Sequence, residues 1–174
     1  MISGRYVTLR SFEKTDLELC KKWVNDPEIA KGILRVLPVS MHEHIQWYEK
    51  IITDKTRVTF AIDTIKGKKY IGNIGLMNID WRNRKAMLWI YLDKNFWNKG
   101  YGREGVHLLL EFAFKSLNLN KVYLNVGSFN EKAIKMYQSL GFKKDGILRE
   151  DIYLDGEYID VLTMSALRKE VLHK

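Results

Sequence analysis

The sequence predicts a mixed α/β fold, with helices packed on a sheet, in a single domain that spans residues 1–174. The first observation is the order of the elements, since strand-like and helix-like segments follow one another as β-α-α-β-β-β-α-β-α-β-β. The second is composition, because 46% of the 174 residues are hydrophobic and 12% are aromatic, enough for a sizeable core. The third is that no repeat, low-complexity tract or linker divides the chain.

The chain opens with a strand and a short helix. Arg5–Arg10 alternates apolar and polar residues, which predicts the strand. Thr15 and Asp16 are N-cap candidates for a helix over residues 17–24. Cys20, the single cysteine, lies on the apolar face of that helix, so we interpret it as a core residue rather than a nucleophile.

A second helix is predicted after an irregular connection. Asn25-Asp26-Pro27 ends the first helix, and residues 27–39 are expected to form a loop or a broken helix. Ser40 and Glu43 have the spacing of a capping box, which predicts a helix that runs to about Ile52.

The central strands are rich in β-branched and aromatic residues. We expect them at 57–65, 70–79 and 86–92, with a polar bend at 80–85. The third of these has no alternation, as expected for a strand that is buried on both faces.

The second half of the chain is predicted to alternate between helices and strands. A helical stripe runs from Val106 to Leu117, and a strand follows at 121–126. A helix over Asn130–Leu140 ends at Gly141, a C′ position where glycine tolerates the left-handed conformation.

The chain is predicted to close with a hairpin. Asp155-Gly156 is a strong hairpin signal between two strand-like segments. The strands are expected at 142–154 and 157–164.

A polar turn with Gly100 and Gly102 joins the strand at 86–92 to the following helix. Such a turn directs free backbone N–H groups at an anion, and the positive end of the helix dipole adds to the attraction. A simple packing turn is the alternative. The turn therefore predicts an anion site, but by itself it does not name the anion.

Several motifs together resemble the GNAT superfamily of acyl-CoA-dependent N-acetyltransferases, and within it the RimJ/RimL-like branch, which acetylates protein N-termini. The motifs that carry the resemblance are Phe96-Trp97-Asn98-Lys99-Gly100-Tyr101-Gly102, Asn130, Tyr137, Gly141-Phe142, Asn25-Asp26-Pro27-Glu28, Arg149-Glu150 and Asp155-Gly156. Because they span nearly the whole chain in the matching order of elements, the resemblance also implies the GNAT fold.

The resemblance implies that acetyl-CoA is the co-substrate. Backbone N–H groups of the glycine turn would hold the pyrophosphate, and the end of the preceding strand would pair with the pantetheine arm. The residues assigned to acetyl-CoA in this way are Ile90, Tyr91, Leu92, Asn98, Lys99, Gly100, Tyr101, Gly102, Arg103 and Asn130.

The resemblance assigns Tyr137 as the general acid. Acetyl transfer expels a thiolate, and a tyrosine hydroxyl within hydrogen-bond reach can protonate it. The alternative is a core aromatic residue, because Tyr137 also lies on the apolar stripe of its helix. Asn130, which we expect to cap that helix and contact the cofactor, has an ordinary N-cap as its alternative.

The general base is not apparent from the resemblance. Related enzymes place a glutamate where this chain has Asn125, and another carboxylate where it has Met87. The reserve candidates are Asp80, Glu43 and Glu150, or a water chain. Since an α-amine has a pKa near 8 and an alkylamine about 10.4, the missing carboxylates favour the α-amine.

We therefore predict an acetyl-CoA-dependent N-acetyltransferase that acts on a primary amine, with a protein N-terminal α-amine as the leading acceptor. Small amines, namely amino sugars, aminoglycosides and polyamines, are the alternative acceptors, and a non-catalytic acyl-CoA-binding module is the alternative function. The acceptor pocket is expected along Ala30–His44, Trp81–Trp89 and the final hairpin, where Trp47, Trp81 and Trp89 face either the acceptor or the core.

The formal net charge of +8 favours anionic partners, but the basic residues are spread along the chain, so nucleic acid is an unlikely partner. No apolar run approaches the roughly 18 residues of a membrane span, and no signal peptide begins the chain, so we expect a cytoplasmic protein without a membrane partner. His42, Glu43 and His44 point apart on a helix, so we expect a solvated helix start and no metal. The oligomeric state is open, with a homodimer as one option.

Overall fold

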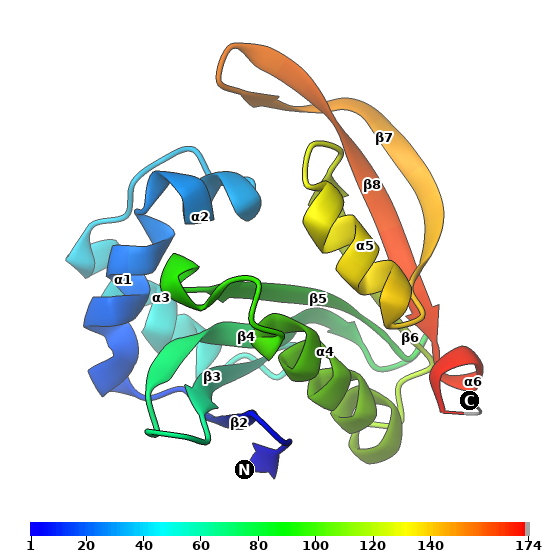
Figure 1. Cartoon of the computed structure of the whole chain (residues 1–174), viewed down its shortest axis with the longest axis horizontal. Helices are drawn as coiled ribbons and strands as arrows, with labels where there is room; N and C mark the ends of the chain where they lie inside the picture. The colour runs from blue at the N-terminus through cyan, green and yellow to red at the C-terminus, as the bar shows by residue number, and fades with distance from the viewer. Residues whose placement is uncertain (173–174) are drawn as a thin grey trace.

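An eight-stranded sheet with the order β1-β2-β3-β4-β5-β6-β8-β7 forms the centre of the fold (Figure 1). The computed structural model describes residues 1–172. Pairing is antiparallel throughout except between β5 and β6, which are parallel. The strands are β1 (Ile2–Ser3), β2 (Val7–Ser11), β3 (Val58–Thr64), β4 (Tyr70–Asp80), β5 (Lys85–Leu92), β6 (Lys121–Gly127), β7 (Lys143–Leu154) and β8 (Glu157–Leu167).

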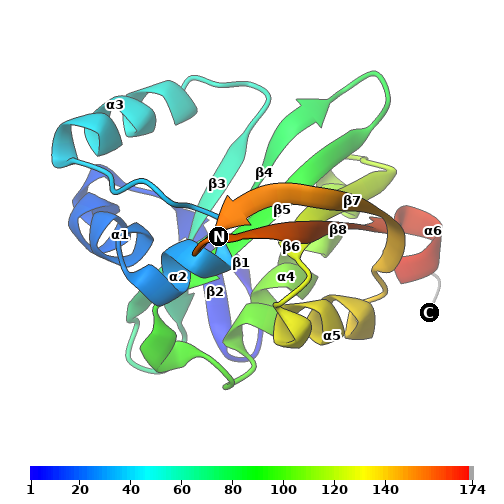
Figure 2. The ribbon, with the colours of Figure 1, turned by 90° about the horizontal axis from the view of Figure 1, so that it is seen from above.

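The helices cover both faces of the sheet (Figures 1 and 2). On one face, α1 and α3 pack their apolar stripes against the sheet, and on the other face α4 and α5 do so. The core therefore forms two clusters with the sheet between them. The helices are α1 (Leu17–Val24), α2 (Pro27–Gly32), α3 (Met41–Ile51), α4 (Tyr101–Glu111), α5 (Glu131–Ser139) and α6 (Arg168–Val171), with the short segments η1 (Lys14–Asp16), η2 (Lys94–Phe96) and η3 (Phe112–Ser116).

The predicted mixed α/β fold is confirmed, and most element boundaries agree within a few residues. The irregular segment 27–39 begins with the short helix α2, because Pro27 occupies its first turn and Asp26 caps it by accepting from the N–H groups of Glu28 and Ile29. The strand β1 and the helix α6 were not predicted. Both are too short to show a periodic pattern.

Of two predictions about side chains in the N-terminal half, one is confirmed in position and one is wrong. Asp16 is the N-cap residue of α1, but its carboxylate accepts from the Arg10 guanidinium at 2.7 and 2.8 Å and from the Glu13 N–H at 2.9 Å rather than from α1. His44 is not part of a solvated helix start, since it is 4% exposed and its ring stacks on Trp47 at 5.1 Å between ring centres.

The closing hairpin is confirmed at the predicted turn. Asp155 and Gly156 have φ angles of 53° and 90°, as a two-residue turn with both central residues in the left-handed region requires. The hairpin is long, and its β7 strand forms the edge of the sheet. The tip therefore reaches across the molecule toward α2 (Figure 1).

Candidate active site

The strands β5 and β6 separate as they leave their common start. They pair only where Lys85–Met87 faces Lys121–Tyr123, among the residues that the structure describes. Farther on, residues 88–92 stay paired with β4, and residues 124–127 stay paired with β8. The facing edges of β5 and β6 therefore open into a wedge, and unpaired strand edges of this kind accept an extended segment by backbone hydrogen bonds.

The glycine turn lies just beyond the end of β5. Asn98 and Gly100 have left-handed φ angles of 59° and 83°, and α4 begins at the next residue, Tyr101. Within residues 1–172, no acceptor takes a hydrogen bond from the backbone N–H groups of residues 98–103. The turn therefore leaves free donors at the start of an 11-residue helix, which is the arrangement that a predicted anion site requires.

The turn is held against the end of β5 by an indole group. Trp97 Nε1 donates to the carbonyl oxygen of Leu92 at 3.0 Å. Gly102 lies directly above the same leucine, and a Cβ atom at position 102 would come within 3.3 Å of Leu92 Cδ1. A larger residue at 102 would therefore push the turn away from the strand.

Two cationic side chains flank the turn, but each has a protein partner. Lys99 Nζ donates to the carbonyl oxygen of Asn95 at 2.9 Å. Arg103 Nε donates to Ser139 Oγ at 3.2 Å, which ties α4 to the end of α5. Tyr101 is half-buried beside Phe96. Lys99 uses one of its three N–H donors and Arg103 one of its five, so both side chains keep donors in addition to those of the backbone.

Tyr91 on β5 is fixed by a buried polar network. Its hydroxyl lies 2.7 Å from Cys20 Sγ and accepts from Asn73 Nδ2 at 2.8 Å, while Tyr70 donates to Asn73 Oδ1 at 2.8 Å. Cys20 is fully buried, which confirms its interpretation as a core residue, and this burial raises the pKa of its thiol to about 12. The network holds β5 from the α1 side at the point where β6 has separated from it.

Helix α5 begins beside the wedge and carries Tyr137. Asn130 caps it, with Oδ1 accepting from the Ala133 N–H at 3.2 Å. Tyr137 is 8% exposed and packs on Phe142 at 5.5 Å between ring centres. Burial raises the pKa of its phenol above the usual value, and no protein group in residues 1–172 hydrogen-bonds its hydroxyl. Tyr137 therefore has both the buried position of a core residue and the free hydroxyl that a general acid requires.

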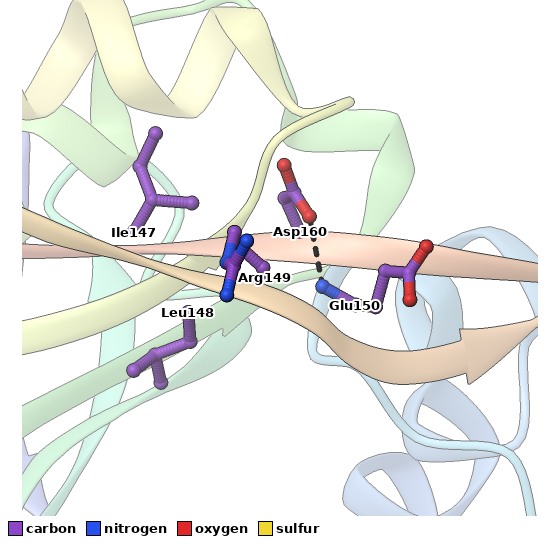
Figure 3. Close-up of a pocket in the computed structure, with 5 residues that line it drawn as sticks. All are labelled: Ile147, Leu148, Arg149, Glu150 and Asp160. Carbon is purple, nitrogen blue, oxygen red and sulfur yellow. Dashed lines mark hydrogen bonds between the residues drawn. The ribbon is translucent and has the colours of Figure 1, made fainter.

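An open cavity of about 650 Å³ lies along the β7–β8 hairpin (Figure 3). Its lining residues are Ile147, Leu148, Arg149 and Glu150 from β7, and Asp160 from β8. The strand bulges between Leu148 and Ile152, and Glu150 has a left-handed φ of 52°. The Glu150 N–H donates to Asp160 Oδ1 at 2.8 Å, which holds the bulge in place.

The comparisons with known proteins identify the family. A family model described as an acetyltransferase (GNAT) domain matches residues 7–143. The chain belongs to the GNAT acetyltransferases. A spermidine N(1)-acetyltransferase from Vibrio cholerae is 30% identical, with 97% of this chain and 96% of that protein covered. An N-acetyltransferase from Bacillus licheniformis named p20 and described as uncharacterized is 34% identical over 94% of each chain.

A solved structure gives the same result. The crystal structure of a spermidine N-acetyltransferase from Vibrio cholerae in complex with CoA and spermine aligns with a TM-score of 0.91 and 31% identity, over 95% of this chain and 98% of that one. The chain is therefore an acetyl-CoA-dependent N-acetyltransferase with the GNAT fold, as the resemblance implies.

Among the candidate bases of this acetyltransferase, only Glu150 lines the cavity. Asp80 lies in a turn where Asn83 donates from its backbone N at 2.8 Å and from Nδ2 at 2.6 Å, which keeps the pKa of Asp80 below its usual value. Glu43 accepts from the Ser40 N–H at 2.8 Å in the predicted capping box, which lowers its pKa in the same way. Both carboxylates already serve local structure.

Asp160 is the charged residue of the cavity lining that the sequence did not single out. It faces the bulged part of β7, and the bulge shifts the register by an amount that the sequence does not reveal. The three tryptophans expected near the acceptor differ in their exposure. Trp81 is 51% exposed at the β4–β5 turn, whereas Trp47 and Trp89 are partly buried against the cluster under α1 and α3.

Residues 1–172 contain no group of three or more His, Cys, Asp or Glu side chains placed to hold a metal ion. No helix among these residues is both long and apolar enough to cross a membrane.

Proposed function

We propose that this acetyltransferase transfers the acetyl group of acetyl-CoA to a primary amine of a polyamine or a closely similar small cationic amine. Both the Vibrio cholerae spermidine acetyltransferase sequence and the crystal structure of such an enzyme with CoA and spermine cover nearly the whole chain. They favour this acceptor over the protein N-terminal α-amine that the sequence led us to expect. We keep the RimJ/RimL-like branch as a proposal that rests on the motifs quoted for the resemblance, among them Phe96–Gly102.

The observation that carries the acceptor class is the pair of carboxylates in the cavity. Glu150 and Asp160 lie on neighbouring strands, and no lysine or arginine of the described chain forms an ion pair with either. Arg149 is the single cation of the lining. The formal net charge of +8 repels a cationic acceptor only weakly, because salt screens charges at long range. The two carboxylates would attract such an acceptor at contact distance, where screening is small.

For the donor, we propose that the free N–H groups of residues 98–103 hold the pyrophosphate of CoA. The open edge of β5 at Ile90, Tyr91 and Leu92 pairs with the pantetheine arm through backbone groups alone, because the Tyr91 side chain is engaged in its buried network. Asn130 contributes by fixing the start of α5 beside the wedge.

In the proposed reaction, the neutral amine attacks the thioester carbon, and the carbon–sulfur bond breaks. Tyr137 gives its proton to the leaving thiolate. The proton that the new amide nitrogen loses passes through water to Tyr137 and restores its phenol. A tyrosine phenol is protonated at neutral pH, and the burial of Tyr137 raises its pKa further. An alkylamine with a pKa of about 10.4 is mostly protonated at pH 7, so it must first lose a proton. We propose Glu150 as the group that takes this proton, directly or through water.

A competition assay tests the proposal. The protein is given acetyl-CoA together with equal concentrations of spermidine, an aminoglycoside and a peptide with a free N-terminus, and the products are counted by mass spectrometry. We expect N-acetylspermidine as the main product. Preferential acetylation of the peptide or the aminoglycoside would contradict the proposed acceptor class while leaving the acetyltransferase activity intact.

A further inference from the structure

Three segments that lie far apart in the sequence meet at Lys31. This residue is in α2, and its Nζ donates to Asp155 Oδ2 at 2.8 Å in the turn between β7 and β8. The same ammonium lies 5.5 Å from the centre of the Phe129 ring, in the connection from β6 to α5. Figures 1 and 2 both place the tip of the hairpin near α2.

A glycine leaves the space that the Phe129 ring occupies. A Cβ atom at Gly127 would lie 2.9 Å from Phe129 Cδ1 and closer still to the neighbouring ring carbon, so only glycine lets the ring fold over the end of β6. The carboxylate of Asp155 and the face of this ring thus converge on one point. A carboxylate and an aromatic face are two groups that attract an ammonium ion.

We propose that Asp155 and Phe129 form a subsite for an alkylammonium group, which Lys31 fills in the free protein and a distal ammonium of a bound polyamine takes over. A lysine side chain ends in a primary alkylammonium, the same chemical group as the end of a polyamine. The inference rests on the proposed function, because it assigns the end of the acceptor that is not acetylated.

Exchange of one ammonium for another at this point is easy. The Lys31 and Asp155 side chains are 48% and 68% exposed, and ion pairs at such exposed positions are weak. Helix α2 does not depend on this pair for its position, because Lys94 binds Asp26 at 3.0 Å and Glu28 at 2.8 Å near the start of the helix. Lys31 can therefore swing away while α2 stays in place.

The position of the subsite suits a long cation. Asp155 is at the tip of the hairpin whose middle carries Glu150 and Asp160. At about 3.3 Å per residue along a strand, the tip lies roughly 15 Å from these carboxylates. A polyamine has several ammonium groups along an extended chain, whereas a monoamine has only the one that reacts, so only the polyamine can use both places.

Calorimetric titration of spermine into the CoA complex of the full chain tests the subsite. Lys31→Met removes the competing ammonium, and we expect spermine to bind about three-fold more tightly. Asp155→Asn removes the carboxylate, and we expect about three-fold weaker binding, with the double variant behaving like Asp155→Asn. Butylamine binding should be the same in all of these proteins.

Lys66→Met is the matched control, because it removes one positive charge from the exposed β3–β4 turn. Equal tightening by Lys66→Met, or no tightening by Lys31→Met, would overturn the subsite, as would a parent protein that does not bind spermine. The proposed function fails separately, when the parent binds spermine but does not acetylate it.

Discussion

Tyr137 is a core residue whose hydroxyl has no protein partner within residues 1–172, and this combination suits a general acid. Replacement by phenylalanine keeps the packing on Phe142 and removes only the hydroxyl. We expect Tyr137→Phe to lower kcat about 100-fold or more while the Kd of acetyl-CoA stays unchanged. Steady-state kinetics and calorimetry check this. Equal kcat in the two proteins from pH 6 to 10 would show that the thiolate leaves without this acid.

Glu150 is the residue for which the base assignment makes a pH-dependent prediction. Without the carboxylate, the enzyme must wait for amine that is already neutral, so activity should rise with pH toward the amine pKa of about 10.4. We expect Glu150→Gln to lower kcat/KM at pH 7 about tenfold, with the loss shrinking as pH increases. Glu157→Gln, on the same hairpin but outside the cavity lining, is the control. A loss that is constant with pH would point to substrate binding instead.

At the scale of the element, the glycine turn makes a prediction with a matched pair of variants. Gly100 and Gly67 have φ angles of 83° and 88°, and an added Cβ would meet no atom within 4 Å at either position. Alanine should therefore cost about 1 kcal/mol of backbone strain at each, or roughly 2–4 °C in Tm. Only Gly100→Ala should also raise the KM for acetyl-CoA. An equal rise in KM for Gly67→Ala would show a general effect of stability.

Helix α4 is also tied to the start of the chain through one carboxylate. Glu104 accepts from the N–H groups of Arg5, Tyr6 and Val7 at 2.6, 2.8 and 2.7 Å. Glu104→Ala leaves these donors without their partner, and we expect a loss of about 2 kcal/mol in the free energy of unfolding. Urea denaturation measures it. A loss below about 0.5 kcal/mol would show that water replaces the carboxylate without cost.

At the scale of the whole molecule, the sequence predicted what depends on local pattern. The order of elements, the cap at Asn130, the glycine turn and the hairpin at Asp155-Gly156 are all set by residues close together in the chain, and the structure contains each of them. The family resemblance added the donor, because its motifs lie in the same local segments.

Contacts between residues far apart in the chain could not be predicted from the sequence. The pair Lys31–Asp155 joins residues that are 124 positions apart, and the sequence pattern around a charged residue does not indicate its partner in space. Asp160 lines the cavity from β8, opposite the bulge of β7, and His44 is buried by the packing of α3, although both side chains are polar. The identity of the acceptor depends on such contacts. For this reason the sequence predicted the donor, acetyl-CoA, better than it predicted the class of acceptor.

The central claim is that the glycine turn at residues 98–103, the open edge of β5 and Tyr137 act on one molecule of acetyl-CoA. A crystal structure of the chain with CoA and spermine tests it most directly. We predict the pyrophosphate within hydrogen-bond distance, about 3 Å, of the backbone nitrogens of the turn, and the CoA sulfur within about 3.5 Å of the Tyr137 hydroxyl. A sulfur atom remote from Tyr137, or a pyrophosphate bound away from the turn, would contradict the account.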